Sequence, residues 1–154
     1  MIYVYGDGSC GVKNRTGAYG TVVVTAKRTV LLSGVECPST VNRCEIKAII
    51  AGLQWIGANV PMCTGMPVQV VSDSEVSIRL LGGEYTPGGN LADLVAQYKS
   101  LAPQFQVHLM WIERNSTEYM EQADALAFAT REHNKKTAWA FYTREERDEG
   151  ISHS

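Results

Sequence analysis

The sequence predicts a single α/β domain in which a five-stranded mixed sheet is flanked by helices, in the order βββαβααβα. Three observations predict this fold class. The chain has 154 residues and is 45% hydrophobic, which is enough for one buried core and too short for two ordinary domains. Its first three periodic segments are strand-like, which favours antiparallel pairing. The later segments alternate helical spacing with short apolar runs, which is typical of crossovers to parallel strands.

The first three strands are predicted from β-branched and aromatic residues. The predicted order is a strand at 2–5, a loop at 6–20, a strand at 21–25 and a strand at 29–35. Lys27 and Arg28 form the expected tight turn before the third strand. These three strands are expected to lie side by side in one part of the sheet.

From Thr40 the spacing of apolar residues becomes helical. Thr40 or Asn42 can cap this helix, and Gly57 with Pro61 marks its end. Asn90 is expected to cap a later helix. The remaining predicted elements are a strand at 68–71, a short helix at 75–81, a glycine-rich loop at 82–89, a helix at 91–101, a strand at 106–112 and a last helix at 117–132.

Charge and cysteine content exclude several classes of function. The formal net charge of −2 argues against a protein that grips nucleic acid through a broad basic surface, although four of the acids lie in residues 145–154. No apolar stretch approaches the roughly 20 residues that span a bilayer, and no leader-like segment precedes the first strand. The four cysteines form no CxxC pair, so reduced thiols are expected. A cytoplasmic monomer that does not work at a membrane is therefore predicted.

Two acids follow predicted strands directly. Asp7 comes after the first strand and Asp73 after the fourth. In open α/β sheets, ligand sites lie beyond the carboxyl ends of strands where the topology switches. Because these two strands are natural central neighbours, both acids are expected at one edge of the sheet.

Two further acids lie on predicted helices. Glu45 is in the first turns of the long helix, one residue before its apolar stripe, so its side chain can border the core and reach the same edge. Asp124 lies between Met120 and Phe128 at i±4 in the last helix, on or beside the buried stripe. A charge in such a place requires compensation.

A divalent cation would compensate four converging carboxylates. Neighbouring carboxylates repel one another, which raises their pKa values and destabilises the fold. Magnesium prefers oxygen ligands, and two such ions roughly 4 Å apart can support hydrolysis of a phosphodiester without a protein nucleophile. Each acid also has a structural interpretation, as a turn former, a helix cap or a partner of a helix dipole. Spacing alone leaves both interpretations open.

Four short motifs, in order, resemble those of type 1 ribonuclease H. They are Tyr5-Gly6-Asp7-Gly8-Ser9-Cys10 followed by Gly17-Ala18-Tyr19-Gly20, then Asn42-Arg43-Cys44-Glu45, then Ser72-Asp73-Ser74, and finally Gln122-Ala123-Asp124-Ala125-Leu126-Ala127. The resemblance covers about residues 1–130, and the predicted order of elements is that of the family. It implies a catalytic domain at 1–132. Residues 133–154 would be a C-terminal extension that packs on the domain, binds a partner or is partly disordered.

The resemblance implies an endonuclease that hydrolyses the RNA strand of RNA/DNA hybrids with Mg²⁺ or Mn²⁺ and leaves 5′-phosphate and 3′-hydroxyl ends. Asp7, Glu45, Asp73 and Asp124 correspond to the metal-binding and catalytic acids of the family. The residues expected at the substrate are Cys10 and Asn42, at the RNA 2′-hydroxyls, and Thr40, at a phosphate. Such contacts read the shape of a duplex, so little sequence preference is expected.

The sequence departs from the family pattern in three places. The loop before the last acid lacks the histidine that many members carry, and Arg114 is expected to act there by its charge, since its pKa forbids proton transfer. Arg114 could equally pair with Glu113 or Glu118. The stretch 82–90 is short and glycine-rich, whereas some members insert a basic helix and loop there that bind the hybrid. Binding of the hybrid should therefore be weaker and sensitive to salt. Val41 and Glu75 replace amides that often lie beside the hybrid.

Two other functions remain open at this point. One is a nuclease of the same fold that acts on DNA or on structured RNA, and the other is a non-catalytic nucleic-acid-binding module. The surroundings of Cys10 and Asn42 favour RNA. The presence of all four acids argues against a module that has lost catalysis.

Overall fold

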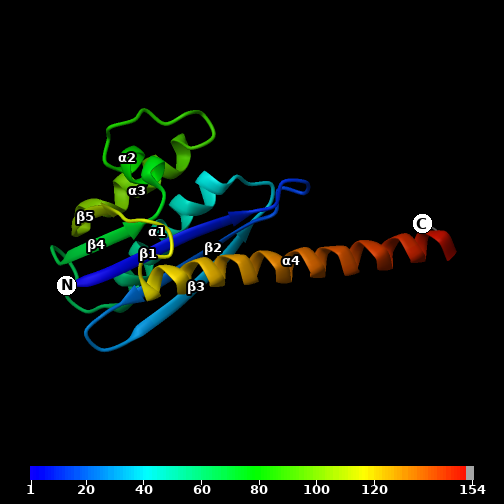
Figure 1. Ribbon diagram of the computed structural model, residues 1–154, viewed down its shortest axis with the longest axis horizontal. Coiled ribbons are helices and arrows are strands. Elements are labelled where there is room, and N and C mark those ends of the chain that lie inside the picture. Colours follow the sequence, from blue (N-terminus) through cyan, green and yellow to red (C-terminus); the bar gives the residue numbers. More distant parts are fainter. Residues whose placement is uncertain (152–154) are drawn as a thin grey trace.

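A computed structural model describes the backbone of residues 1–151 and the side chains of residues 1–134 (Figure 1). The elements are β1 (Ile2–Cys10), β2 (Gly17–Val24), β3 (Thr29–Glu36), α1 (Val41–Asn59), β4 (Pro67–Ser72), α2 (Glu75–Leu81), α3 (Ala92–Leu101), a short 3-10 turn (Ala102–Gln104), β5 (Gln106–Trp111) and α4 (Glu118–Ile151). The five strands form one sheet in the order β3-β2-β1-β4-β5. β1 pairs antiparallel with β2 and parallel with β4. The predicted mixed sheet and order of elements are confirmed.

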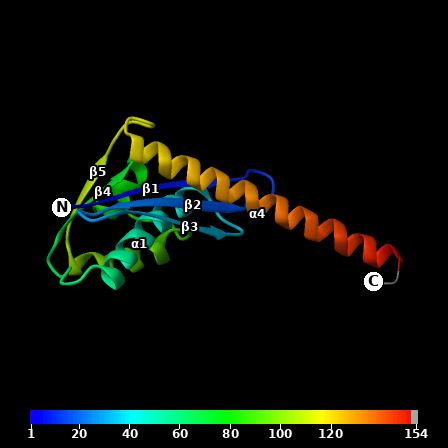
Figure 2. The same ribbon diagram turned by 90° about the horizontal axis from the view of Figure 1, so that it is seen from below.

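Helices α1 and α4 cover opposite faces of the sheet (Figures 1 and 2). The main core lies between the sheet and α1, where Ile46, Ile49, Leu53 and Ile56 are fully buried against apolar side chains of β1 and β4. These residues recur every three or four positions, so one stripe of the helix faces the sheet. Thr40 caps α1, since its hydroxyl accepts a hydrogen bond from the Arg43 N–H at 3.2 Å.

The first strand is longer than predicted. β1 continues past Tyr5 to Cys10, because β2 pairs with it along almost its whole length. Its parallel pairing with β4 ends at Tyr5 and Val71. Asp7 therefore lies inside β1, although it is already beyond the last residue of β1 that pairs with β4.

Two helix boundaries also differ from the prediction. Asn90 does not cap α3, whose first residue follows Leu91 without a side-chain cap, and the Asn90 carbonyl instead accepts a hydrogen bond from Arg43. Helix α4 continues past Glu132 to Ile151, because no glycine or proline interrupts residues 118–149. The packing of the predicted extension at 133–154 lies largely outside the described residues. Within the part of the chain that is described, no helix is both long and apolar enough to cross a bilayer.

Two glycines let the helices approach the sheet closely at the level of Asp7. A Cβ atom added to Gly8 would lie 2.6 Å from the backbone nitrogen of Glu45 in α1. A Cβ atom added to Gly20 would overlap the Ala123 carbonyl oxygen in α4. Gly20 pairs with Asp7 across the ladder between β1 and β2. The backbone of both helices is thus brought against the strand residues that surround Asp7.

Candidate metal and catalytic site

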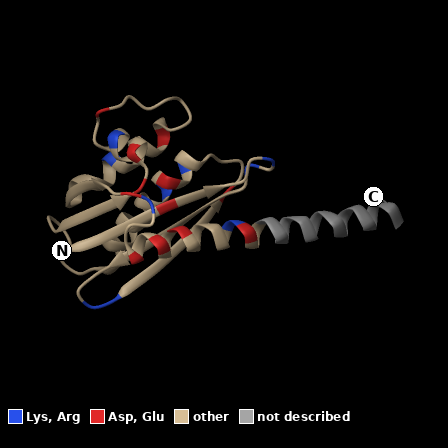
Figure 3. Cartoon of the chain, viewed as in Figure 1, with Lys and Arg blue, Asp and Glu red and all other residues tan. Residues whose placement is uncertain are grey.

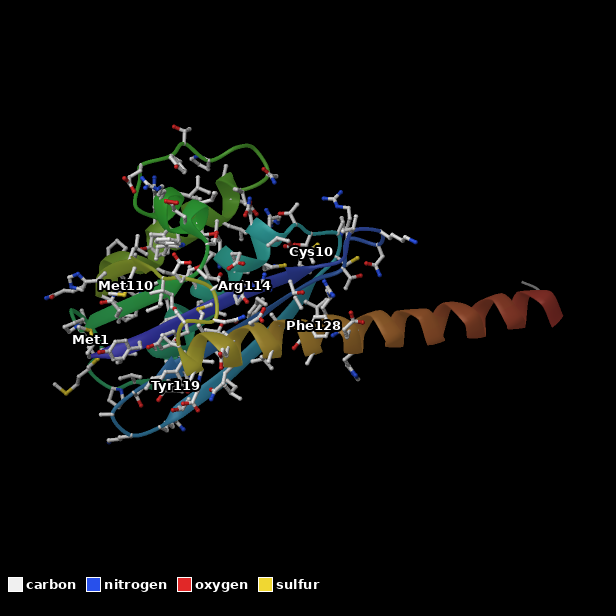
Figure 4. The ribbon with its side chains drawn as sticks, viewed as in Figure 1. Met1, Cys10, Met110, Arg114, Tyr119 and Phe128 are labelled. Carbon is white, nitrogen blue, oxygen red and sulfur yellow. The ribbon has the colours of Figure 1, made fainter. Side chains whose placement is uncertain are left out.

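A pocket of about 540 Å³ opens where β1, β4, α1 and α4 meet. Its lining includes all four predicted acids and Arg114. The full lining is Asp7, Gly8, Ser9, Cys10, Val41, Glu45, Asp73, Ser74, Arg114, Asp124, Phe128 and Arg131. Figure 4 shows Cys10 on β1, Arg114 in the loop before α4 and Phe128 on α4 around this region. Five segments distant in sequence therefore contribute to one hollow.

Three of the acids form a tight group. Asp7, Glu45 and Asp73 each offer a carboxylate oxygen, and these oxygens all lie within 4.8 Å of one another. Asp7 and Glu45 are buried, with 5% of each residue exposed, whereas Asp73 is half-buried. Asp124 lines the same pocket from α4 but lies outside this group of three.

The crowding of these acids changes their acidity. Burial raises the pKa of Asp7 to about 7, and the nearby Asp124 and Asp73 contribute to the rise. Burial and the charge of Asp7 likewise raise the pKa of Glu45 well above its usual range. Burial raises the pKa of Asp73, while the positive charge of Arg114 opposes that rise. Without a cation, the folded protein therefore disfavours the charged form of these carboxylates.

One carboxylate oxygen of the site has no partner. Glu45 Oε2 is buried and accepts no hydrogen bond from any residue that the structure describes. A buried acceptor left unpaired is costly, unless something outside the chain satisfies it. A donor set made only of carboxylate oxygens suits hard divalent cations such as Mg²⁺. The residues present therefore fit a divalent metal ion.

Arg114 stands in the loop between β5 and α4. It is exposed, it lines the pocket, and its positive charge acts on Asp73. Among the described side chains it forms no ion pair with Glu113 or Glu118, which the sequence left open as its partners. The indole N–H of Trp111 donates to the Asp73 carbonyl at 3.1 Å, which ties the start of this loop to the acid.

The three predicted substrate-binding residues occupy different places. Cys10 lines the pocket. Thr40 and Asn42 do not line it, although Val41 between them does, and Asn42 is exposed at the first turn of α1. The Thr40 hydroxyl is engaged as the helix cap. Of the three, only Cys10 is therefore part of the pocket lining.

Several lining residues were not singled out from the sequence. They are Ser9, Ser74, Phe128 and Arg131. The expectation that Phe128 belongs to the buried stripe of α4 is wrong, since it is 53% exposed. The buried face consists of Met120, Ala123 and Ala127, which turns Phe128 toward the pocket. Its spacing of four residues from Asp124 places the two on one helix face and could have revealed it.

Comparison with known proteins identifies related sequences. A family profile described as RNase H matches residues 1–132. A ribonuclease H of Cupriavidus pinatubonensis is 29% identical over 140 residues, which cover 82% of this chain and 92% of that protein. A ribonuclease H of Thiobacillus denitrificans is 26% identical over 141 residues, with coverage of 82% and 90%.

Solved structures share the fold. The N-terminal RNase H domain of a Mycobacterium tuberculosis protein superposes with a TM-score of 0.74 at 24% identity, covering 89% of this chain and 97% of that one. An RNase H1 isolated from compost by a metagenomic approach superposes with a TM-score of 0.75 at 23% identity, covering 87% and 97%. At these identities the structural likeness bears on the fold alone.

Proposed function

Because the chain belongs to the ribonuclease H family, we propose that it hydrolyses the RNA strand of RNA/DNA hybrids internally, leaving 5′-phosphate and 3′-hydroxyl ends. Asp7, Glu45, Asp73 and Asp124 would hold divalent metal ions, with Mg²⁺ as the preferred ion and Mn²⁺ as a substitute. The observation that carries the proposal is the unpartnered Glu45 Oε2 inside a group of three converging carboxylates.

Bound divalent ions would supply the positive charge that activates a water molecule and stabilises the leaving oxygen. The side chains of the chain itself have separate tasks. Asp7 and Glu45, buried between β1 and α1, fix the position of the charged centre. Asp73 and Asp124 approach the same pocket from β4 and α4. The four acids thus come from different elements and would surround the reacting phosphate.

Arg114 is proposed to act by charge. Its exposed guanidinium lies near Asp73 at the mouth of the pocket, where it can attract the phosphate and stabilise negative charge after cleavage. A guanidinium does not give up its proton at neutral pH. The role given to a loop histidine in many family members is therefore taken by a permanent cation.

Cys10, Asn42 and Thr40 are proposed to position the hybrid. Cys10, which lines the pocket, and Asn42, which is exposed in the first turn of α1, would contact the RNA 2′-hydroxyls, the group that separates RNA from DNA. Thr40 would contact a phosphate near the first turn of α1. The stretch 82–90 adds little positive charge, because Arg79 beside it pairs with Glu75 and Glu84. Affinity for hybrid should accordingly be weak, because few phosphates of the duplex can be neutralised.

The decisive experiment compares cleavage of an RNA/DNA hybrid, a DNA duplex and an RNA duplex of the same sequence, with Mg²⁺ or with EDTA. We expect that only the hybrid is cleaved, and only when Mg²⁺ is present. The Asp73→Asn variant should lose this cleavage. Cleavage of duplex DNA or RNA at a rate equal to that of the hybrid would favour a different nuclease of this fold. Binding of hybrid without cleavage under every metal condition would favour a non-catalytic module.

A further inference from the structure

A second hollow adjoins the catalytic pocket. It has a volume of about 300 Å³ and is lined by Cys10, Gly11, Val12, Lys13, Asn14 and Arg131. Cys10 and Arg131 also line the catalytic pocket. The two hollows are therefore parts of one groove, which runs from the acids past the end of β1 to the loop that joins β1 to β2.

The two ends of this groove differ in charge. The catalytic part contains four carboxylates, whereas the lining of the second hollow contains two cations, Lys13 and Arg131, and no acid. A further cation lies close by. Burial raises the pKa of the Cys10 thiol, and the positive charges of Arg15 and Arg131 oppose that rise. The lining of the second hollow thus carries net positive charge, with Glu132 paired to Arg131 and Glu36 the nearby acid that acts on Cys10.

Arg131 is held in a defined position rather than extended into solvent. Its guanidinium carbon lies 5.1 Å from the centre of the Phe128 ring, and its Nη2 contacts Glu132 at 3.1 Å. Only 20% of its side chain is exposed. A guanidinium carries five N–H donors in a fixed plane, which matches the paired oxygens of a phosphate. Its contact with the ring reduces the entropy that binding would otherwise cost.

The position of Arg131 along α4 sets which phosphate it can reach. Arg131 follows Asp124 by seven residues, so the two share a helix face and are about 10 Å apart along its axis. Arg131 lines both the pocket of the carboxylates and the second hollow beyond it. Its place in the second hollow makes it available to a phosphate other than the one that would lie among the carboxylates.

We propose that Arg131 and Lys13 bind a phosphate of the cleaved strand beyond the scissile one, with Phe128 positioning the Arg131 guanidinium. This inference rests on the proposed function, because it takes the cleaved nucleic-acid strand as the occupant of the groove. The strand is identified by continuity, since the second hollow shares Cys10 and Arg131 with the pocket in which the scissile phosphate is proposed to lie.

The test compares Arg131→Gln with the matched control Arg28→Gln. Arg28 also lies over an aromatic ring, that of Trp55 at 5.0 Å, but it belongs to a different pocket at the other end of the strands. Hybrid cleavage by Arg131→Gln should show a KM about tenfold higher with kcat within twofold of the original chain. Arg131→Lys should recover part of the loss, and Arg28→Gln should change neither constant.

A second arm measures binding of the hybrid in EDTA, where no cleavage is required. The slope of log Kd against log salt should become shallower by about 1 in Arg131→Gln, as expected for one lost phosphate contact. Phe128→Leu should raise KM less than Arg131→Gln does. Phe128→Tyr, which keeps the aromatic ring, should have the KM of the unsubstituted protein. An unchanged salt slope together with an unchanged KM in Arg131→Gln would overturn the subsite.

Single uncharged methylphosphonates, placed in turn along each strand, identify the phosphate. At one position of the cleaved strand, the methylphosphonate should weaken binding of the hybrid to the unsubstituted protein. In Arg131→Gln the same methylphosphonate should cause no further loss, as a double-mutant cycle requires. Independent losses at every position, or coupling to a position of the other strand, would overturn the assignment. Failure of the original chain to cut any hybrid would instead refute the proposed function, which distinguishes the two failures.

Discussion

Glu45 carries the largest conflict between charge and burial among the acids of the site. The residue is 5% exposed, and its Oε2 accepts no hydrogen bond from a described residue. Burial and the charge of Asp7 raise its pKa. A cation would remove both penalties at once. Glu45 should therefore lower the stability of the metal-free protein, and this loss of stability can be measured.

We expect Glu45→Gln to stabilise the metal-free protein and to abolish cleavage. The amide cannot ionise in the buried site and can donate to Asp7, so the midpoint of thermal unfolding in EDTA should rise by about 2–4 °C, equivalent to about 1 kcal/mol. Cleavage of hybrid in Mg²⁺ should fall by more than about 100-fold. The control is Glu84→Gln, whose carboxylate is exposed. A lower unfolding midpoint for Glu45→Gln in EDTA would argue against charge repulsion in the site.

At Arg114 the prediction concerns charge rather than proton transfer. Arg114→Ala should lower kcat for hybrid cleavage by about tenfold, the effect of about 1.4 kcal/mol of lost electrostatic stabilisation. Arg114→Lys should keep most of the activity, because it retains the charge near Asp73. The pH dependence of kcat should lack a contribution from residue 114. Equal kcat values in the alanine variant and the original chain would remove Arg114 from the mechanism.

At the scale of elements, the spacing of apolar residues predicted the helix α1 correctly. The end of β1 was not predicted, because it depends on pairing with a neighbouring strand. The apolar spacing of α1 and its cap at Thr40 are local properties, and both are present. The end of β1 is not local, since pairing with β2 carries the strand through a glycine-rich segment to Cys10. Phe128 was misplaced for a similar reason, because the small residues Ala123 and Ala127 face the sheet.

The close contact of β1 with α1 gives a prediction at this scale. Gly8→Ala should destabilise the fold by about 1–3 kcal/mol, because the added Cβ would lie 2.6 Å from the Glu45 nitrogen and would push the helix away from the strand. The denaturation midpoint in urea should fall accordingly, and hybrid cleavage should fall with it as Glu45 moves. The matched control is Gly89→Ala, where an added Cβ meets nothing within 4 Å. Equal midpoints in the two variants would show that α1 can adjust.

At the scale of the whole molecule, the charged residues coloured in Figure 3 lie over several elements, with Lys and Arg interspersed among Asp and Glu. The acids that converge do so because the sheet joins β1 and β4 in parallel while α1 and α4 approach from opposite faces. A second group of charged residues lowers the pKa of an acid instead of raising it. Arg43 and Lys47 of α1 pair with Glu36 of β3, and Arg43 also pairs with Asp93 of α3. These pairs hold the pKa of Glu36 at about 2.

The two groups predict opposite responses of stability to pH in different ranges. The pKa of Glu36 is lowered, so its contribution is complete above about pH 5 and is lost as the pH falls toward 2. The pKa of Asp7 is raised from about 4 in the unfolded chain to about 7 in the folded one. The folded state therefore binds more protons between these values. The contribution of Asp7 is complete below pH 4 and is lost as the pH rises through 7.

The free energy of unfolding in EDTA should therefore decrease between pH 5 and pH 8, as urea denaturation at each pH can measure. With saturating Mg²⁺ the trend should reverse, because a metal ion binds the deprotonated carboxylates and stabilises the folded state more as the pH rises. Glu45→Gln should flatten both curves, since it removes a member of the acidic group. If stability in EDTA rose with pH over this range in the original chain, the carboxylates would be compensated without a metal ion, and the metal assignment would lose its physical basis.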